Sequence, residues 1–201
     1  MHFSPILLLY SLLSLIPTIA SAPTGDLSPR TCPSTIIKDG SFESGTVPQT
    51  SGTTWTVVNT RGFYSSYSVT NPGSPSGGKN AFTVSHLPGP YDGTGIRELR
   101  QTLSTCVGKN YSITADFKFE AAANNYCSLA VVYPFKTGVG SVTTSSATPG
   151  LTPGVWSTTG GFFQAVSSSS LLNFVFRCDN QERNKISLDN VKVNLFNGNA
   201  Y

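Results

Sequence analysis

The stretch KISLDNVKVNLF, residues 185–196, constrains the fold most because its apolar positions change register partway through. They fall on even numbers first and on odd numbers afterwards: Ile186 and Leu188, then Val191, Val193 and Leu195. Side chains alternate between the two faces of a strand, so this switch predicts a β-bulge near Asp189 that keeps both apolar sets on one core. The bulge re-aims a carboxylate. We expect Asp189 to act together with Glu43, in a second unusual stretch, IIKDGSFESG.

Short runs with strand character follow one another along the chain. The clearest is NYSITADFKFE, residues 110–120, in which apolar and polar side chains alternate without a break. Further runs are expected at residues 36–38, 54–59, 63–70, 80–86, 96–104, 126–133, 155–165, 171–178 and 186–196. Residues 71–78, 87–95 and 143–154 are rich in Gly, Pro and Ser and are expected to be loops. No stretch has a helical period, so the pattern predicts an all-β, antiparallel β-sandwich.

The N-terminus has the pattern of a secretory signal. Residues 3–20 are almost uncharged and precede Ala20-Ser21-Ala22, which has the small-x-small form of a cleavage site. We expect a signal peptide at residues 1–22, although Pro23 leaves cleavage after Ala20 open. The alternative, a membrane anchor, is disfavoured because the apolar run is shorter than the roughly 20 residues that span a bilayer. An extended leader, 23–33, would precede one domain, 34–201.

Composition narrows the class of partner. Only 11% of the 201 residues are charged and the formal net charge is +3, with no run of Lys or Arg, so a nucleic-acid partner is not expected. The sequence contains no second long apolar run, so a membrane partner is not expected. Secretion would leave about 180 residues, enough for a single domain with its own core, which we expect to be a released monomer.

The four cysteines are even in number, which in a secreted chain favours two disulfides. Cys127 shares parity with the apolar residues of 126–133, and Cys178 shares parity with those of 171–178. Both sulfurs should therefore face the core, and we expect Cys127 to pair with Cys178. Cys32 and Cys106 would then pair by elimination.

Several motifs together resemble one family. They are DGSFESG at residues 39–45, GKNAFTV at 78–84, the block LRQTLSTCVGKNYSITADFKF at 99–119, ISLDNVKV at 186–193, and two tryptophans, Trp55 and Trp156. In this order they resemble the CenC-like carbohydrate-binding modules of families four and nine, and more narrowly the secreted fungal proteins that consist of one such module. The resemblance covers roughly residues 36–195 and implies a galactose-binding-like jelly roll.

The resemblance also implies a structural calcium ion. Its ligands would be the carboxylates of Glu43 and Asp189 and a backbone oxygen of Ser41, with a further backbone oxygen near Gly78 and Lys79. Calcium takes six to eight oxygen ligands of this mixed kind. The alternative is that Glu43 caps a turn and Asp189 accepts backbone N–H groups at the bulge.

A carbohydrate partner needs flat aromatic faces surrounded by groups that bind hydroxyls. The aromatic candidates are Tyr64, Tyr67, Tyr91, Tyr126 and Trp55. Arg97, Arg100 and Gln101 lie on a strand that often lines the concave face in this fold, and they could reach sugar hydroxyls. Parity predicts that Tyr64 and Tyr126 face outward. Trp55 and Trp156 are expected in the core.

Catalysis is not expected. Only His86 remains once the signal is removed. Asp92, Glu98, Asp116 and Glu120 leave a carboxylate pair open; Asp116 and Glu120 share a strand face, as acids on a solvated strand commonly do. We therefore predict a secreted, non-catalytic carbohydrate-binding protein, with a polysaccharide or cell-wall glycan as its ligand. The alternatives are a structural or host-interaction protein that keeps the fold and, less favoured, a glycan-cleaving enzyme.

Asn110-Tyr111-Ser112 is an N-glycosylation sequon at a strand start, and Asn110 has outward parity.

Overall fold

The computed structural model describes residues 32–46, 54–61, 65–86, 95–120, 127–135, 138–145, 148, 150–178 and 184–196. The expected signal peptide and the leader up to residue 31 lie outside these ranges. Residues 32–201 form one compact unit. Its described strands are β1 (Thr56–Arg61), β2 (Ser65–Thr70), β3 (Ala81–His86), β4 (Gly95–Ser104), β5 (Asn110–Phe119), β6 (Cys127–Phe135), β7 (Gly138–Ser145), β8 (Ser157–Gln164), β9 (Ser169–Cys178) and β10 (Asn184–Phe196).

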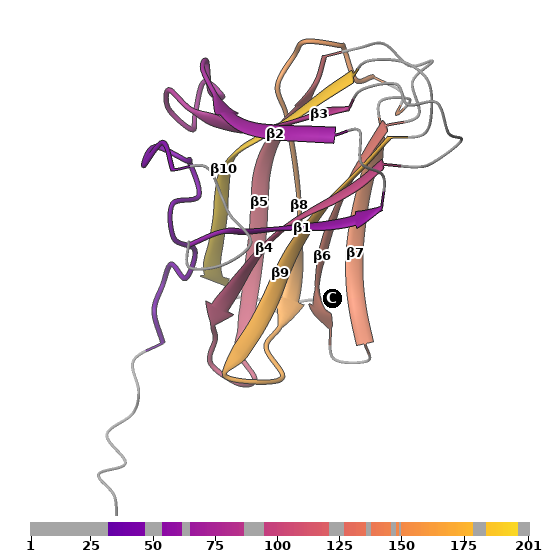
Figure 1. The fold of residues 1–201 in the computed structure, drawn as a ribbon. Coiled ribbons are helices and arrows are strands. Elements are labelled where there is room, and N and C mark those ends of the chain that lie inside the picture. Colours follow the sequence, from indigo (N-terminus) through magenta and orange to yellow (C-terminus); the bar gives the residue numbers. More distant parts are fainter. Residues whose placement is uncertain are drawn as a thin grey trace, which may run out of the picture. The chain divides into compact units, whose positions relative to one another are not determined.

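The strands form two antiparallel sheets of five strands each (Figure 1). One has the order β1-β4-β9-β6-β7 and is called the β9 sheet after its central strand; the other, β2-β3-β10-β5-β8, is the β10 sheet. No helix, and so none able to cross a membrane, is found among the described residues. The prediction of an all-β, antiparallel sandwich is confirmed.

The core lies between the two sheets, and alternate side chains of β5 and β9 point into it. In β5 the buried apolar residues are those of the expected alternation: Tyr111, Ile113, Ala115, Phe117 and Phe119. In β9 the same parity buries Leu172, Phe174 and Phe176. Trp55 is also in the core, as expected, and its indole nitrogen donates to the backbone oxygen of Asp39 at 2.9 Å.

The predicted bulge in β10 is present. The register between β10 and β5 shifts between Asp189 and Lys192, and Asn190 has a φ of 50°. Leu188 before the shift and Val191 and Val193 after it are all buried. One inserted residue therefore keeps the second half of the strand in the same core as the first.

Both expected disulfides are present. Cys127 and Cys178 lie opposite each other on β6 and β9, with Cα atoms 4.0 Å apart. Cys32 is bonded to Cys106, which ties the start of the described chain to the turn after β4.

Two segments differ from the expected strands. Strand β7 was not predicted, because its sequence GVGSVTTS is small and polar, as a loop would be. Residues 36–38 form no strand; the segment meets β10 through a bridge between Thr35 and Asn194 and a hydrogen bond from Ile36 to Val193.

Candidate functional site

The outer face of the β9 sheet carries the strongest candidate for a binding site. In β4, Leu99 and Leu103 are buried in the core, so the even-numbered residues Glu98, Arg100 and Thr102 point outward. The register across β4 and β9 places outward residues side by side: Glu98 with Val175, Arg100 with Asn173, and Thr102 with Leu171. On the other side of β4, Thr56 of β1 pairs with Arg100.

Three of these outward residues form a hydrogen-bonded cluster. Oε2 of Glu98 accepts from Nε of Arg100 at 2.9 Å and from Nδ2 of Asn173 at 2.6 Å. A second guanidinium nitrogen of Arg100 binds the same oxygen. Oδ1 of Asn173 is buried without a hydrogen-bond partner among the described residues, and an unpaired buried acceptor costs about 1 to 3 kcal/mol. A hydroxyl or a water that reached this oxygen would recover part of that cost.

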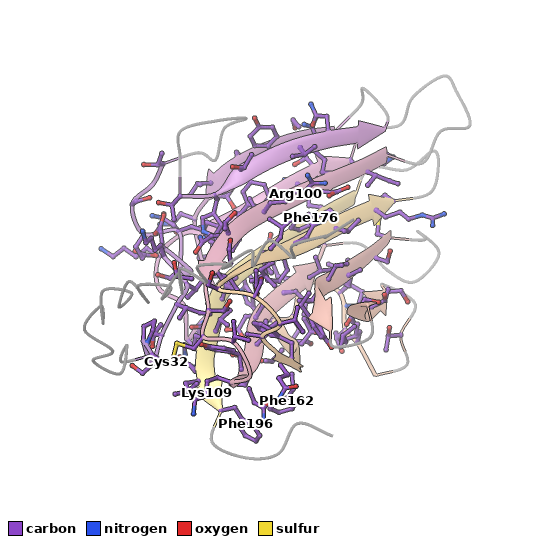
Figure 2. The ribbon with its side chains drawn as sticks, turned by 90° about the horizontal axis from the view of Figure 1, so that it is seen from below. Cys32, Arg100, Lys109, Phe162, Phe176 and Phe196 are labelled. Atoms are coloured by element: carbon purple, nitrogen blue, oxygen red, sulfur yellow. A yellow bond between two sulfur atoms is a disulfide. The ribbon has the colours of Figure 1, made fainter. Side chains whose placement is uncertain are left out.

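A depression of about 610 Å³ lies beside this cluster. We call it the β1–β4 trough; it is lined by Ile36, Lys38, Thr54, Thr56, Val58, Arg100, Gln101, Thr102, Ser104 and Leu171. Hydroxyls and two cationic side chains dominate this lining, and hydroxyls both donate and accept hydrogen bonds. No aromatic or acidic side chain is among the described lining residues. The trough therefore suits a hydroxyl-rich ligand held by hydrogen bonds. Figure 2 shows Arg100 among the side chains of the strands.

Gln101 lies at the trough but has a structural role. It is 5% exposed, and its side-chain amide binds the backbone of Lys38 twice. Oε1 accepts from the N–H of Lys38 at 2.8 Å, and Nε2 donates to its carbonyl at 2.9 Å. Gln101 therefore fixes the segment that forms one wall of the trough, and its amide is already occupied.

Arg97 also points inward. It is 8% exposed, its guanidinium carbon lies 5.0 Å from the centre of the Tyr67 ring, and it donates to Oδ1 of Asn59. Burial lowers the pKa of Arg97, partly offset by Tyr67. Arg97 and Gln101, predicted as sugar-binding residues, are therefore both buried and point away from the outer face of the sheet. Leu99 and Leu103 share their parity, and this signal in the sequence identifies the outward residue as Arg100.

Of the four tyrosines predicted to bind a sugar, only Tyr67 lies among the described residues. Tyr67 packs against the core, with its ring centre 6.0 Å from that of Phe82. Tyr64, Tyr91 and Tyr126 lie outside the described residues. Trp156, expected in the core, is instead half-buried, and Nζ of Lys118 lies 5.3 Å from its ring centre. It precedes β8 and does not begin the strand, so strand parity does not apply to it.

The two acids expected to bind calcium both hold the loop between β2 and β3. Oε1 of Glu43 accepts the backbone N–H groups of Lys79 at 2.7 Å and Asn80 at 2.8 Å. Oδ2 of Asp189 accepts the N–H of Ser74 at 2.6 Å, and Oδ1 accepts that of Asn190 at 2.6 Å. Both acids thus accept hydrogen bonds from backbone N–H groups, as the alternative to a calcium site predicts.

Asp116 lies opposite Asp189 in the register of β5 and β10 and joins the same network. Its carboxylate accepts from Oγ of Ser74 at 2.9 Å, Nδ2 of Asn190 at 3.0 Å and Oγ1 of Thr158 at 2.8 Å. Burial acts to raise the pKa of Asp116, but side-chain hydrogen bonds outweigh it, so the pKa lies below its ordinary value. Burial raises the pKa of Asp189, and the charge of Asp116 adds to the rise, against hydrogen bonds from Ser74 and Asn190.

The oxygen atoms around this loop fit calcium chemically. A Cβ built on Gly73 would lie 2.6 Å from the backbone oxygen of Asn80, 2.7 Å from Oδ2 of Asp189 and 2.8 Å from the backbone oxygen of Gly78. A Cβ on Gly78 would lie 2.6 Å from Oε1 of Glu43. Carboxylate and backbone oxygens thus gather on one loop, and this mixture is the one calcium prefers. The described residues contain no group of three acid, histidine or cysteine side chains that could hold a metal. A calcium ion here would therefore need backbone oxygens, including that of Ser41.

The described acids do not form a catalytic pair in the trough. Glu98 lies on the outer face of the β9 sheet and is bound by Arg100 and Asn173. Asp116 lies on β5 in the β10 sheet, and Glu120 directly follows that strand. His86 is buried at the end of β3. Asp92 lies outside the described residues.

Comparisons with known proteins find solved structures of similar fold but no matching family. No family model matches the sequence, and no curated protein matches it. Among solved structures, the TmCBM61 module in complex with β-1,4-galactotriose is 15% identical with a TM-score of 0.54; the match covers 81% of this chain and 99% of that one. The CBM22-1 xylan-binding domain of Xyn10C from Paenibacillus barcinonensis is 17% identical with a TM-score of 0.50, over 80% and 94%.

A third match is the enzymatically active domain of tailspike protein 4 from bacteriophage CBA120. It is 15% identical with a TM-score of 0.54 and covers 81% of this chain, but this chain spans only 21% of the tailspike chain. At these identities the likeness shows a shared β-sandwich fold.

Proposed function

We propose that this chain is a secreted, non-catalytic carbohydrate-binding protein, and that it binds a polysaccharide or cell-wall glycan on the outer face of the β9 sheet. The observation that carries the proposal is the β1–β4 trough, a depression of about 610 Å³ that hydroxyls and two cations line. Most of its residues come from β1, β4 and β9, neighbouring strands of one sheet whose backbone hydrogen bonds hold them in place, and Gln101 holds the segment at Lys38.

The chemistry of the trough favours a ligand with many hydroxyl groups. Thr56, Thr102 and Ser104 offer hydroxyls that both donate and accept, and Arg100 offers donors that Glu98 holds in a fixed direction. Lys38 adds a positive charge at one wall. Solved structures of the same fold include modules described as bound to β-1,4-galactotriose or as xylan-binding, which supports a glycan as the class of ligand.

A second candidate function is a structural or host-interaction role without a sugar site. The observation that favours it is the lack of aromatic side chains among the described residues of the trough, since stacking on sugar rings normally contributes to such sites. Tyr64, Tyr91 and Tyr126 remain proposed stacking residues, and they lie outside the described part of the chain. Without them, binding would rest on hydrogen bonds alone.

We also propose a structural calcium ion at the loop between β2 and β3. Glu43 and Asp189 would supply carboxylate oxygens, and Ser41 and Gly78 backbone oxygens. The oxygens that converge around Gly73 and Gly78 support this site. When bound, the ion would neutralise carboxylates that have no cationic partner among the described residues.

The function can be tested by screening the purified protein on a glycan array and on insoluble chitin, cellulose, xylan, β-glucan and β-1,4-galactan. A shallow site of this kind should bind with micromolar to millimolar dissociation constants. Arg100→Ala and Thr102→Ala should weaken any binding found, whereas Lys192→Ala, an exposed position on the other sheet, should not. Absence of binding to every glycan would reject the proposal in favour of the structural role.

A further inference from the structure

Two aromatic rings lie together on the outer face of the β10 sheet, whereas the β1–β4 trough belongs to the β9 sheet. The ring centres of Phe162 on β8 and Phe196 on β10 are 4.9 Å apart. Phe162 is 47% exposed, which is unusual for so large an apolar side chain, and Phe196 is half-buried. Figure 2 shows both side chains at the same end of the molecule. The pair forms an apolar surface that no described residue covers completely.

The strand between these two rings carries the sequon. In the register of the sheet, Phe196 is opposite Asn110, and Phe162 is opposite Ser112, both on β5. Directly opposite residues on antiparallel strands have Cβ atoms about 4.5 to 5.5 Å apart. Tyr111 between them is buried in the core, so Asn110 and Ser112 share the outer face with the two rings. The rings thus meet over the two outward residues of the sequon.

We propose that Asn110 carries an N-linked glycan, and that Phe162 and Phe196 form the surface against which its innermost N-acetylglucosamine residues pack. The apolar face of a pyranose ring suits an aromatic face, and a covalently attached sugar needs no further binding energy to be held near it. The proposal rests on passage through the secretory route but not on sugar binding in the trough.

The glycan would come from a lipid-linked oligosaccharide pyrophosphate. The bond between C1 of the first sugar and the phosphate oxygen breaks, and a bond from C1 to Nδ2 of Asn110 forms. The amide loses one proton, which leaves with the lipid pyrophosphate. Transfer onto the unfolded chain would precede strand pairing, so packing on the rings would follow when β8 and β10 join β5.

The test compares three forms of the protein secreted from a eukaryotic host: fully glycosylated, trimmed by an endoglycosidase to one N-acetylglucosamine, and freed of glycan by an amidase. Each is made for the wild type, for Phe162→Ala, and for Lys192→Ala as a control on the same face. In the wild type and the control, the trimmed form should melt at a higher temperature than the glycan-free form. In Phe162→Ala this difference should disappear.

A proton NMR spectrum of the trimmed form gives an independent readout. The N-acetyl methyl signal should lie upfield of its position in free N-acetylglucosamine in the wild type, because it sits over an aromatic face, and it should return to the free position in Phe162→Ala. Three results would overturn the proposal: a peptide with Asn110 that carries no glycan mass, a melting difference that Phe162→Ala leaves unchanged, or a dimer that forms through the rings whether or not the glycan is present.

Discussion

Gln101 binds both backbone groups of Lys38, with contacts of 2.8 Å to its N–H and 2.9 Å to its carbonyl, across a sequence separation of 63 residues. The amide thereby replaces the partner that a neighbouring strand would provide. It joins the segment after Cys32 to β4 and sets the position of one wall of the trough. A buried glutamine in a strand interior is explained by this pair of bonds.

Gln101→Met should lower the free energy of unfolding by about 1 to 2 kcal/mol, because it keeps the side-chain length but leaves two backbone groups of Lys38 without partners. Urea unfolding monitored by tryptophan fluorescence measures this change. Thr102→Ala, at the next and exposed position, is the control and should change stability by less than about 0.5 kcal/mol. Equal stability of both variants would show that the bonds to Lys38 are dispensable.

Replacing Cys127 and Cys178 together by alanine should cost about 2 to 4 kcal/mol, because the crosslink restricts a 51-residue separation in the unfolded chain. Both cysteines are also buried, so their loss removes core contacts as well. Urea unfolding of the double variant against the wild type gives the value. A cost below about 1 kcal/mol, or peptide mapping that links Cys32 to Cys178, would contradict the assigned pairing.

The lowered pKa of Asp116 makes a prediction for acid stability. A carboxyl group with a depressed folded pKa stabilises the fold above its unfolded pKa of about 4, and this contribution is lost as the pH falls through the folded value. The free energy of unfolding should therefore drop on acidification below about pH 4 in the wild type, and less steeply in Asp116→Asn. Asp189 has a raised pKa and contributes with the opposite sign, since its contribution falls as the pH rises from about 4. Identical pH profiles for the two proteins, both measured with chelator, would refute the role of Asp116.

Calcium should raise the melting temperature of the wild type, and a chelator should lower it, because an ion that binds only the folded state stabilises it by mass action. Glu43→Gln keeps an oxygen for the N–H groups of Lys79 and Asn80 but removes the charge, so its melting temperature should not respond to calcium. Glu120→Gln, at an exposed acid paired with Lys118, is the control and should respond like the wild type. A wild type that melts equally with calcium and with chelator would reject the ion.

The sequence predicted the architecture because strand periodicity carries most of that information. The alternation of residues 110–120 matches β5, and the parity switch near Asp189 matches the bulge in β10. The parity of Cys127 and Cys178 identified their pairing. Strand β7 could not be predicted, because a Gly, Ser and Thr sequence at a sheet edge has no apolar alternation that separates it from a loop.

The candidate site was predicted less well, because a binding surface depends on which face of a strand a residue occupies and on contacts between distant segments. Arg97, Arg100 and Gln101 were predicted together from one strand, although the parity of Leu99 and Leu103 separates the buried Arg97 and Gln101 from Arg100. The bond from Gln101 to Lys38, and the position of Asn173 beside Arg100, depend on the register between strands. No local pattern in the sequence encodes that register.

NMR titration shows directly whether a glycan binds on the outer face of the β9 sheet. The isotope-labelled protein would be titrated with an oligosaccharide of whichever polysaccharide it retains in the screen. The backbone amides of Thr56, Arg100 and Thr102 should shift with the ligand, and those of Thr114 and Lys192 on the β10 sheet should not. Shifts confined to the β10 sheet, or none with any glycan, would contradict the assignment.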